Sequence, residues 1–369
     1  ELTRATEVTT EQFRVFWGRR LGCAECHDHP FENWSQDQYW GLAAFFGNMT
    51  RIAEVSGMRG PYFVIDDPAG HGFRKLGRGK LIHPRTKEPV VPTFLDGSVL
   101  PENQRRDLRA RLADWVTSPE NPYFAEAIVN RLWAYFMGRG IVDPVDDFGI
   151  ENPPTHPELL AALADDFVAH GYDLQHLMRT ILQSRTYQLS GEPNETNARD
   201  EVNYARALPR LLEPPVLMDV IAQVTGINSE LVASGEGDAT HGVPASVRAI
   251  SVLPDDLECT FFDAFNRNDR RGVPEEKPQL TVLRSLHRLV GPTFSGFVGH
   301  GGRLDRLLAN GASDDEIIEE LYLVAATRHP TDAEREQLQR LISSESSREV
   351  GLDSLVWALV NAREFVYNH

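Results

Sequence analysis

Residues 121–140, NPYFAEAIVNRLWAYFMGRG, have the clearest helix pattern in the chain and limit its fold the most. Asn121 is a favoured N-cap, and Pro122 suits the first helical position, where a backbone N–H would have no partner within the helix. Apolar residues then recur at helical spacing, and two glycines follow that can end the helix in the left-handed conformation. The pattern predicts a helix over 122–137, and most of the chain after residue 105 has the same character.

Three further helix starts follow the capping-box pattern, in which a Ser or Thr is followed three residues later by Glu. The pairs are Thr155 with Glu158, Ser313 with Glu316, and Thr331 with Glu334. Each pair precedes an amphipathic run, such as LLAALADDFVAH, whose apolar residues would face a core. These patterns predict a large helical domain over residues 106–369.

The N-terminal part of the chain predicts smaller elements. We expect helices over 9–20 and 35–49, with Ser35 as the N-cap of the second. Residues 55–105 are rich in Gly and Pro and alternate only weakly, which predicts a loop-rich insert with two or three short strands. The predicted fold class is therefore mainly α, with an N-terminal helical module over 1–54, the insert, and the helical domain.

Composition excludes several classes of partner. The formal net charge is −17, which disfavours nucleic acid because its phosphates would be repelled. It would steer a basic redox partner protein favourably, although many acidic proteins carry such a charge only for solubility. No run approaches the ~18 apolar residues of a spanning helix, so we expect no membrane span. Three cysteines are too few for a disulfide scaffold. Cys259 stands alone in the sequence and is expected to be a small buried residue.

The other two cysteines lie close together in LGCAECHDHPF, residues 21–31. Cys23, Cys26 and His27 match Cys-x-x-Cys-His, the attachment motif of c-type haem. One helical turn separates two thiols by about the spacing of the two porphyrin vinyl groups, and the histidine that follows can bind the iron. Aromatic residues of the preceding helix are placed to pack on a haem edge: Phe13, Phe16 and Trp17.

Three other interpretations of this motif stay open. Zinc or another transition metal could bind Cys23, Cys26, His27 or His29, although a second cysteine pair is absent and distant histidines would be needed. A redox-active Cys-x-x-Cys is also possible, but no βαβ pattern surrounds it. Finally, the cysteines could be buried thiols or form a local disulfide, with histidines that only form hydrogen bonds.

The longer string CAECHDHPFENWSQDQYWGLAAFF resembles a planctomycete-type family of cytochrome-c-associated proteins that contain two consecutive uncharacterised domains. IHPRTKEPVVPTFLDG, SDDEIIEELYLVAATRHPT and the terminal REFVYNH are similar to the family as well. The resemblance implies export to the periplasm or cell exterior, together with haem chemistry, but gives no substrate. Members usually have a long segment ahead of the cysteines, often with a separate cytochrome c domain. The chain therefore looks like either a short relative or the C-terminal part of a larger protein with an additional N-terminal cytochrome domain.

With the resemblance added, the preferred cofactor is one covalent haem c on Cys23 and Cys26, with His27 as the proximal iron ligand. Candidates for the opposite face of the iron are His83, in the family-like His-Pro-Arg-Thr segment, and Met49, at the end of the second predicted helix. His83 is favoured over Met49. His29 is too close to His27 in sequence to reach over the ring, and a five-coordinate iron with an open face is a further alternative.

Helix 122–137 is the candidate wall for this haem, because the N-terminal helices are too short to enclose it alone. The wall would consist of Phe124, Ile128, Leu132, Trp133 and Phe136. Other polar residues favour structural roles. Asp146 and Asp147 are expected in a turn and cap, and Arg131 in a partly buried ion pair. Three histidines are expected to form hydrogen bonds only: His156, His176 and His287.

The favoured function is electron transfer by an exported c-type haem protein, alone or as the redox relay of a haem-dependent oxidoreductase. One alternative is a metal-binding or scaffold protein without haem. Another is an enzyme that acts on extracellular polysaccharide with unrecognised catalytic residues. The chain has no Gly-x-Ser-x-Gly, phosphate loop, His-Glu-x-x-His or dinucleotide fingerprint, so catalysis itself is left open.

Overall fold

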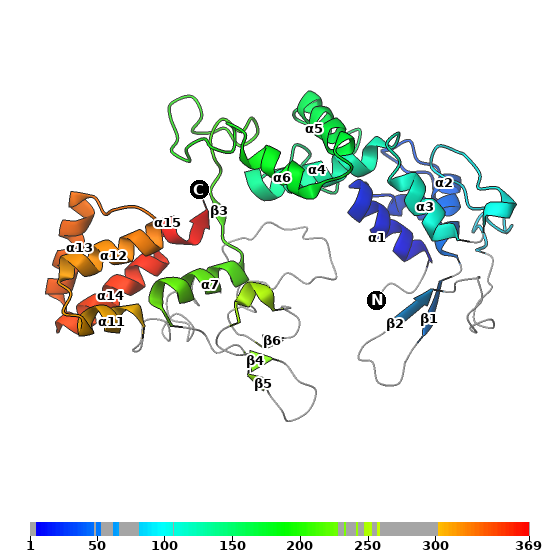
Figure 1. Ribbon diagram of the computed structural model, residues 1–369. Coiled ribbons are helices and arrows are strands. Elements are labelled where there is room, and N and C mark those ends of the chain that lie inside the picture. The colour runs from blue at the N-terminus through cyan, green and yellow to red at the C-terminus, as the bar shows by residue number, and fades with distance from the viewer. Residues whose placement is uncertain are drawn as a thin grey trace. The chain divides into compact units, whose positions relative to one another are not determined.

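The computed structural model is mainly helical, which confirms the predicted fold class (Figure 1). Its contacts divide the chain into two compact units, Glu1–Leu208 and Pro209–His369. The predicted domain boundaries near residues 54 and 105 stay predictions. The described residues are 5–47, 49–52, 62–65, 81–105, 107–227, 232–233, 241–242, 247–252, 257–258 and 302–368.

The first unit contains six α-helices in its described part. They are α1 (Ala5–Trp17), α2 (Gln36–Ala43), α3 (Leu108–Val116), α4 (Pro122–Met137), α5 (Pro157–Ala169) and α6 (Leu174–Leu182). Short 3₁₀ turns accompany them: η1 (Gly22–Glu25), η2 (Ala44–Phe46) and η3 (Glu102–Gln104). Strands β1 (Met49–Ile52) and β2 (Tyr62–Ile65) pair antiparallel, with Met49 opposite Ile65. The bounds of α4 confirm the helix that the sequence predicted over 122–137.

Two predictions near the N-terminus need correction. The helix expected over 35–49 ends at Ala43 and continues as a 3₁₀ turn to Phe46, so Met49 begins a strand instead of ending a helix. The first helix ends at Trp17, earlier than expected, because Gly18 adopts a left-handed φ of +62°. A Cβ on Gly18 would lie 2.7 Å from the ring of Phe148, whose backbone N–H donates to the Gly18 carbonyl at 2.8 Å.

Helix caps explain most of the boundaries. Ser35 caps α2 in a capping box with Gln38, and Asn121 caps α4 through the N–H of Tyr123. The capping box expected at Thr155 is wrong. Helix α5 begins at Pro157, and the hydroxyl and N–H of Thr155 both donate to the carbonyl of Ile141, at 3.0 and 2.9 Å.

The first unit holds two hydrophobic clusters. One packs α1, α2 and α3 together around Phe13, Trp17, Leu42 and Phe45. The other packs α4, α5 and α6 around Trp133, and Trp133 meets Tyr204 edge to face at 5.3 Å. The apolar stripe of α4 thus forms helical core.

A buried carboxylate connects α1 to the loop after α4. Asp146, with a side chain only 2% exposed, accepts from Arg14 at 3.2 Å and from Arg20 at 3.1 Å. Arg131 of α4 donates to the backbone carbonyl of Arg14 at 2.8 Å, and Asp146 is its nearby counter-charge. Asp147 lies at the edge of this group, 3.6 Å from Arg20. The expected turn at Asp146 is thereby also the centre of a charge cluster that fixes helix positions.

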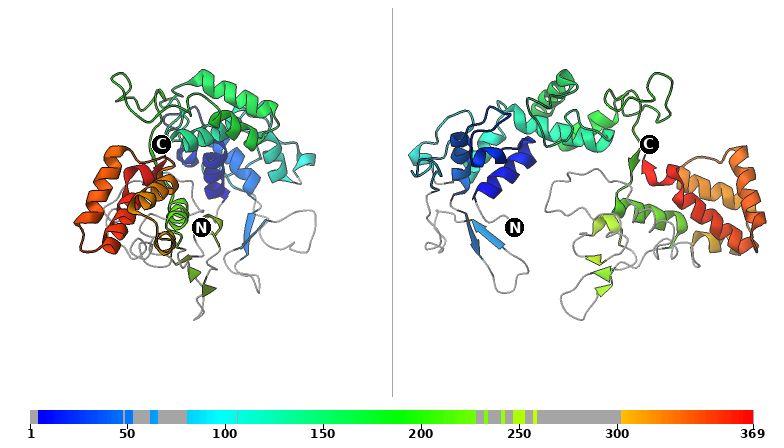
Figure 2. Two further views of the ribbon diagram at one scale, coloured as in Figure 1. Left: turned by 60° about the vertical axis from the view of Figure 1, so that its left-hand side comes forward. Right: turned by 180° about the vertical axis from the view of Figure 1, so that it is seen from behind.

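The second unit contains α7 (Pro214–Thr225), α11 (Arg303–Ala309), α12 (Asp314–Ala326), α13 (Asp332–Ser344), α14 (Arg348–Asn361) and α15 (Arg363–Val366). Helices α12, α13 and α14 lie side by side (Figures 1 and 2). The capping boxes predicted at Ser313 and Thr331 are confirmed.

Short strands complete the second unit. Strand β3 (Arg210–Leu211) pairs antiparallel with β7 (Tyr367–Asn368), and β4 (Val232–Ala233) lies between β5 (His241–Gly242) and β6 (Leu257–Glu258). A 3₁₀ turn, η4 (Ala249–Ser251), packs on α7. None of the described helices has the length and hydropathy required to cross a membrane. The predictions for Cys259 and His287 fall outside the described residues.

Candidate functional site

The Cys-x-x-Cys turn presents both of its thiols to solvent. Cys23 lies within η1 and Cys26 directly follows it, and both cysteines are free and exposed. Leu21 and Ala24 are only 1% and 0% exposed, and the N–H of Ala24 donates to the Leu21 carbonyl at 2.9 Å. Leu21 and Ala24 therefore hold the turn in the core, while Cys23 and Cys26 on its other side expose their sulfur atoms to solvent. The expectations of buried thiols or a local disulfide are not met.

Helix α2 holds the turn in place through the carbonyl of Glu25 and the carboxylate of Asp28. The carbonyl oxygen of Glu25 accepts from the side-chain amide of Gln36 at 3.0 Å and from the indole N–H of Trp40 at 2.9 Å. The carboxylate of Asp28 accepts from the backbone N–H of Gln36 at 2.8 Å. Three hydrogen bonds thus tie residues 25–28 to the first turn and a half of α2, so the segment around His27 has a defined shape.

His27 has the hydrogen bonding of a histidine that is ready to bind a metal. Its Nδ1 lies 2.7 Å from the backbone carbonyl of Asp28. A carbonyl can only accept, so Nδ1 holds the proton and Nε2 of the neutral ring keeps a lone pair. The side chain is exposed. Metal-binding histidines commonly donate their other N–H to a carbonyl in this way, which fixes the orientation of the ring.

His29 has the opposite arrangement. Its Nδ1 accepts from the backbone N–H groups of Phe31 and Glu32, at 3.3 and 3.0 Å. The Nδ1 lone pair is therefore occupied within its own loop, and the proton of the neutral ring lies on Nε2. The loop is held further by Glu32, whose carboxylate accepts from the N–H of Ile150 at 2.7 Å. His29 thus shapes the loop after the cysteines.

The side chain of Trp40 lies between His83 and the cysteine turn and contacts both. His83 is buried, and its ring meets Trp40 edge to face at 5.8 Å, while Trp40 also contacts the Glu25 carbonyl. Its Nδ1 accepts from the N–H groups of Arg85 and Thr86. Its Nε2 lies 3.1 Å from a carboxylate oxygen of Asp37 but is not aligned for a hydrogen bond.

Because Nδ1 of His83 accepts both backbone N–H groups, Nε2 of the neutral ring carries the proton, and it faces Asp37. For Met49, the other sixth-ligand candidate, the structure describes only the backbone, in β1. Neither residue is placed against His27 by a described contact.

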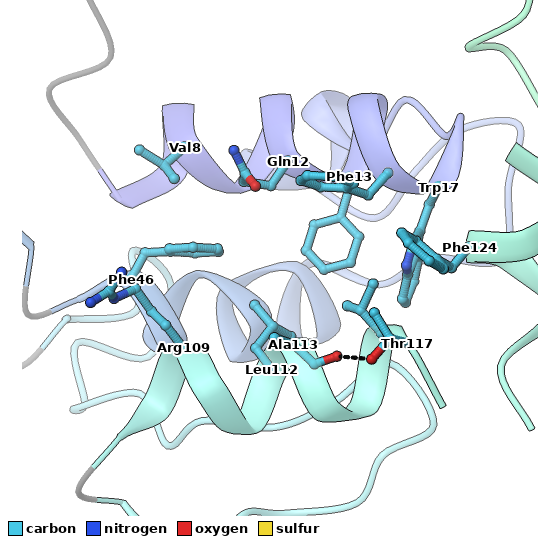
Figure 3. Close-up of a pocket in the computed structure, with 12 residues that line it drawn as sticks. Val8, Gln12, Phe13, Trp17, Phe46, Arg109, Leu112, Ala113, Thr117 and Phe124 are labelled. Atoms are coloured by element: carbon cyan, nitrogen blue, oxygen red, sulfur yellow. Dashed lines mark hydrogen bonds between the residues drawn. The ribbon is translucent and has the colours of Figure 1, made fainter. Parts of the chain in front are cut away.

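An apolar cavity of about 440 Å³ lies between α1 and α3 (Figure 3). The ring of Phe13 points into it from α1, Leu112 closes it from α3, and Phe124 borders it at the start of α4. Phe16 and Trp17 line it as well. The aromatic residues expected on a haem edge therefore gather around one cavity, together with the first residue of the predicted wall.

The cysteine turn does not line this cavity. Cys23, Cys26 and His27 are not among the residues that line it. A Cβ on Gly22 would contact Thr10, and each residue of a helix turns about 100° around its axis. Among the residues that line the cavity, Gln12 and Phe16 are then more than ~100° away from Thr10 around α1, whereas Phe13 and Trp17 lie within ~60° of it.

A group of side chains that could hold a metal ion was not predicted. Within the described residues, one set of three brings its potential ligand atoms within 4.8 Å of one another: Asp166, His170 and His176. The hydrogen bond expected of His176 is confirmed, since its Nε2 lies 2.7 Å from Asp166. The spacing of Asp166 and His170, four residues apart on a helix, was the available sequence pattern.

Comparisons with known proteins match both parts of the chain. A model named PSD1, described as a protein of unknown function (DUF1553), matches residues 108–342. A model named PSCyt2, described as a protein of unknown function (DUF1549), matches residues 1–51, which include the cysteine turn. Two consecutive domains of unknown function, as expected from the resemblance, are thereby confirmed. Searches of curated proteins and of solved structures found no match.

Proposed function

The chain belongs to the PSD1 family of proteins of unknown function (DUF1553), and for this member we propose electron transfer through one covalent haem c at the cysteine turn. The observation that carries the proposal is the arrangement of Cys23, Cys26 and His27. Two free, exposed thiols lie on one short helical turn, directly before a histidine whose Nδ1 donates to a backbone carbonyl. The donor set fits haem c, because the thiols can be reached and the Nε2 lone pair is free.

In this proposal Cys23 and Cys26 each add their S–H across one vinyl group, which forms two thioether bonds, and Nε2 of His27 is the proximal ligand. Haem c supplies a one-electron carrier when it is bound. The chain contributes the rest. Gln36 and Trp40 hold the turn through the Glu25 carbonyl, and Asp28 fixes the orientation of the His27 ring.

Two further observations favour haem over a zinc ion at this turn. Zinc needs four ligands in a structural site, yet among the described residues no third His, Cys, Asp or Glu gathers with the cysteines in a cluster of that kind. In addition, the name PSCyt2 of the family model that matches residues 1–51 hints at an association with cytochrome c. Export to the periplasm or cell exterior is part of the same proposal.

The attachment is tested by expression together with a cytochrome c maturation system. The purified wild-type protein should gain the mass of one haem and keep a haem stain after denaturation. Cys23→Ala together with Cys26→Ala should lose both signals and retain the helical circular dichroism spectrum. Cys259→Ala is the matched control and should keep the haem. A folded wild-type protein without added mass, or a double variant that keeps covalent haem, would overturn the proposal.

His83 is the proposed sixth ligand, with Met49 as the second candidate. His83 would have to turn its Nε2 away from Asp37, which is 65% exposed and can move into solvent. In the haem-loaded protein, His83→Ala should convert the iron to a high-spin spectrum, and Met49→Ala should leave it unchanged. A low-spin spectrum in the His83 variant would exclude His83.

A further inference from the structure

Asp166, His170 and His176 form a compact cluster where α5 meets α6, distant in sequence from the cysteine turn. One carboxylate oxygen of Asp166 lies 2.7 Å from Nε2 of His176, and the other lies 3.2 Å from Nδ1 of His170. The two imidazole rings stack with their centroids 3.7 Å apart and their planes 17° from parallel. A single carboxylate thus faces two imidazoles at once.

The local backbone brings the three side chains together. Asp166 lies in the last turn of α5 and His170, four residues later, is its C-cap, so the two side chains lie on one side of the helix end. Gly171 and Tyr172 then both adopt left-handed φ values, +66° and +61°, which reverse the chain sharply. Asp173 caps α6 through the N–H groups of Gln175 and His176. The reversal therefore places His176 back against the end of α5.

The reversal is fixed to the core. The hydroxyl of Tyr172 donates to the carbonyl of Thr117 at 2.9 Å, and its ring packs edge to face on Phe124 and Phe167. Phe167 and Leu177, the neighbours of Asp166 and His176 in sequence, are 1% and 0% exposed. The backbone under the cluster is therefore held by packing, while the three polar side chains remain between 27% and 48% exposed.

The protonation of His170 leaves a nitrogen for a metal. Its Nδ1 lies 2.8 Å from the backbone carbonyl of Asp166, and a carbonyl can only accept, so Nδ1 holds the proton. Nε2 of the neutral ring then keeps its lone pair. Two imidazoles and one carboxylate form the kind of ligand set that Zn²⁺ and similar transition ions bind.

The distances suit a single ion. Zinc–ligand bonds of about 2.1 Å place the ligand atoms of a tetrahedral site about 3.4 Å apart. The separation of 2.7 Å between the Asp166 carboxylate and Nε2 of His176 is below that value, and a bound ion replaces the proton of that hydrogen bond. The 3.2 Å separation belongs to Nδ1 of His170, which keeps its proton, so the His170 ring must turn to present Nε2. One ring nitrogen of each histidine and a carboxylate oxygen of Asp166 lie within 4.8 Å of one another, so a pair of atoms at that limit would have to close by about 1.4 Å. Rotation of exposed side chains provides such a change without backbone movement.

We propose that Asp166, His170 and His176 bind one divalent transition-metal ion, with Zn²⁺ as the reference ion and a water molecule in the remaining position. The site is independent of the haem proposal, because it lies on α5 and α6 and shares no residue with the cysteine turn. The exposure of all three side chains leaves the ion open to solvent on one side.

Isothermal titration of the full chain with zinc chloride tests this site. Because exposed thiols also bind zinc, Cys23 and Cys26 are first blocked with iodoacetamide under native conditions. The blocked protein should bind one equivalent of Zn²⁺. His170→Ala and His176→Ala should each weaken that binding by about tenfold or more, as should the near-isosteric Asp166→Asn. His329→Ala is the matched control, since His329 pairs with Glu319 at 3.1 Å but no second histidine of the described residues forms a cluster with that pair.

Cobalt provides a second readout of the same ligands. Co²⁺ bound to the blocked wild-type protein should show ligand-field bands without a thiolate charge-transfer band, and these bands should be lost in the His170 and His176 variants. Circular dichroism confirms that each variant is folded. Absence of zinc binding by the folded blocked protein, or affinities in the His170 and His176 variants equal to that of His329→Ala, would overturn the proposal.

Discussion

At the scale of single residues, backbone conformation at Gly18 decides where the first helix stops. Its φ of +62° is disfavoured for any residue with a Cβ, and a Cβ there would also approach Phe148 to 2.7 Å. The following residues, up to the cysteine turn, depend on this stop for their direction. Gly97 has a similar φ of +82° but has nothing within 4 Å of a Cβ position. A comparison of alanine substitutions at the two glycines therefore separates the cost of a left-handed φ from the cost of a steric clash.

Gly18→Ala should lower the free energy of unfolding by more than Gly97→Ala. Strain alone costs about 1 kcal/mol in the left-handed region, and the contact with Phe148 should raise the loss at Gly18 to about 2–4 kcal/mol. Thermal unfolding followed by circular dichroism measures both variants against the wild type. Equal losses in the two variants would show that Phe148 moves aside without cost.

Hydrogen-bond direction is the other feature at this scale that shapes function. His27 and His170 each place Nδ1 against a backbone carbonyl, whereas His29 and His83 each accept backbone N–H groups at Nδ1. The first pair therefore keeps a free Nε2 lone pair in the neutral ring, and the second pair does not. His29 therefore shapes its own loop, and His83 can bind the proposed iron only after its proton moves from Nε2 to Nδ1.

At the scale of helices and strands, the start of α13 combines a cap with an ion-pair network. Glu334 accepts from the N–H and hydroxyl of Thr331, and Arg328 bonds to Glu334 and to Glu364 of α15. The Arg328 guanidinium is the main cause that lowers the pKa of Glu334 from 4.5 to about 2. Arg328 thus links the first turn of α13 to α15.

This network predicts a specific loss of stability in acid. The pKa of Glu334 is lower in the folded state than in the unfolded chain, so its contribution is complete above about pH 5 and is lost as the pH falls from there towards 2. Glu334→Gln should flatten the fall of the thermal midpoint between pH 5 and pH 2.5. The matched control is Glu316→Gln, in a capping box where Ser313 hydrogen bonds lower the pKa of an exposed carboxyl. A steeper or unchanged profile in the Glu334 variant would contradict the assignment.

At the scale of the whole molecule, the formal net charge of −17 should raise the association rate with basic proteins and lower it with acidic ones. The proposed haem would sit at an exposed turn that neighbours Glu25 and Asp28, so approaching partners meet negative charge. The electrostatic attraction between this acidic surface and a basic protein is screened beyond ~8 Å at physiological ionic strength. The preference for basic over acidic partners should therefore decrease as the salt concentration rises.

The haem-loaded protein should exchange electrons faster with a small basic redox protein than with an acidic one of similar potential. The bimolecular rate constant with the basic partner should fall about tenfold or more between ~10 mM and ~500 mM salt. Stopped-flow absorbance measures both reactions. A rate with the basic partner that does not change with salt would exclude electrostatic steering by the protein surface.

The sequence by itself determined the features whose causes lie within one or two turns of the chain. The helix Pro122–Met137, its Asn121 cap and its Gly138 end were all predictable, as were the capping boxes at Ser313 and Thr331. The Cys-x-x-Cys-His motif belongs to the same group. Caps, helical periodicity and short motifs depend on residues three or four positions apart, and such patterns are present in the sequence itself.

Only the tertiary structure decided the features that join distant segments. Thr155 caps no helix because the carbonyl of Ile141 takes its hydrogen bonds, and Asp146 is a charge centre because α1 brings Arg14 to it. His176 reaches Asp166 because the chain reverses at Gly171 and Tyr172 and packing holds that reversal. These contacts depend on where packed helices place side chains that are far apart in sequence, and no local pattern specifies that.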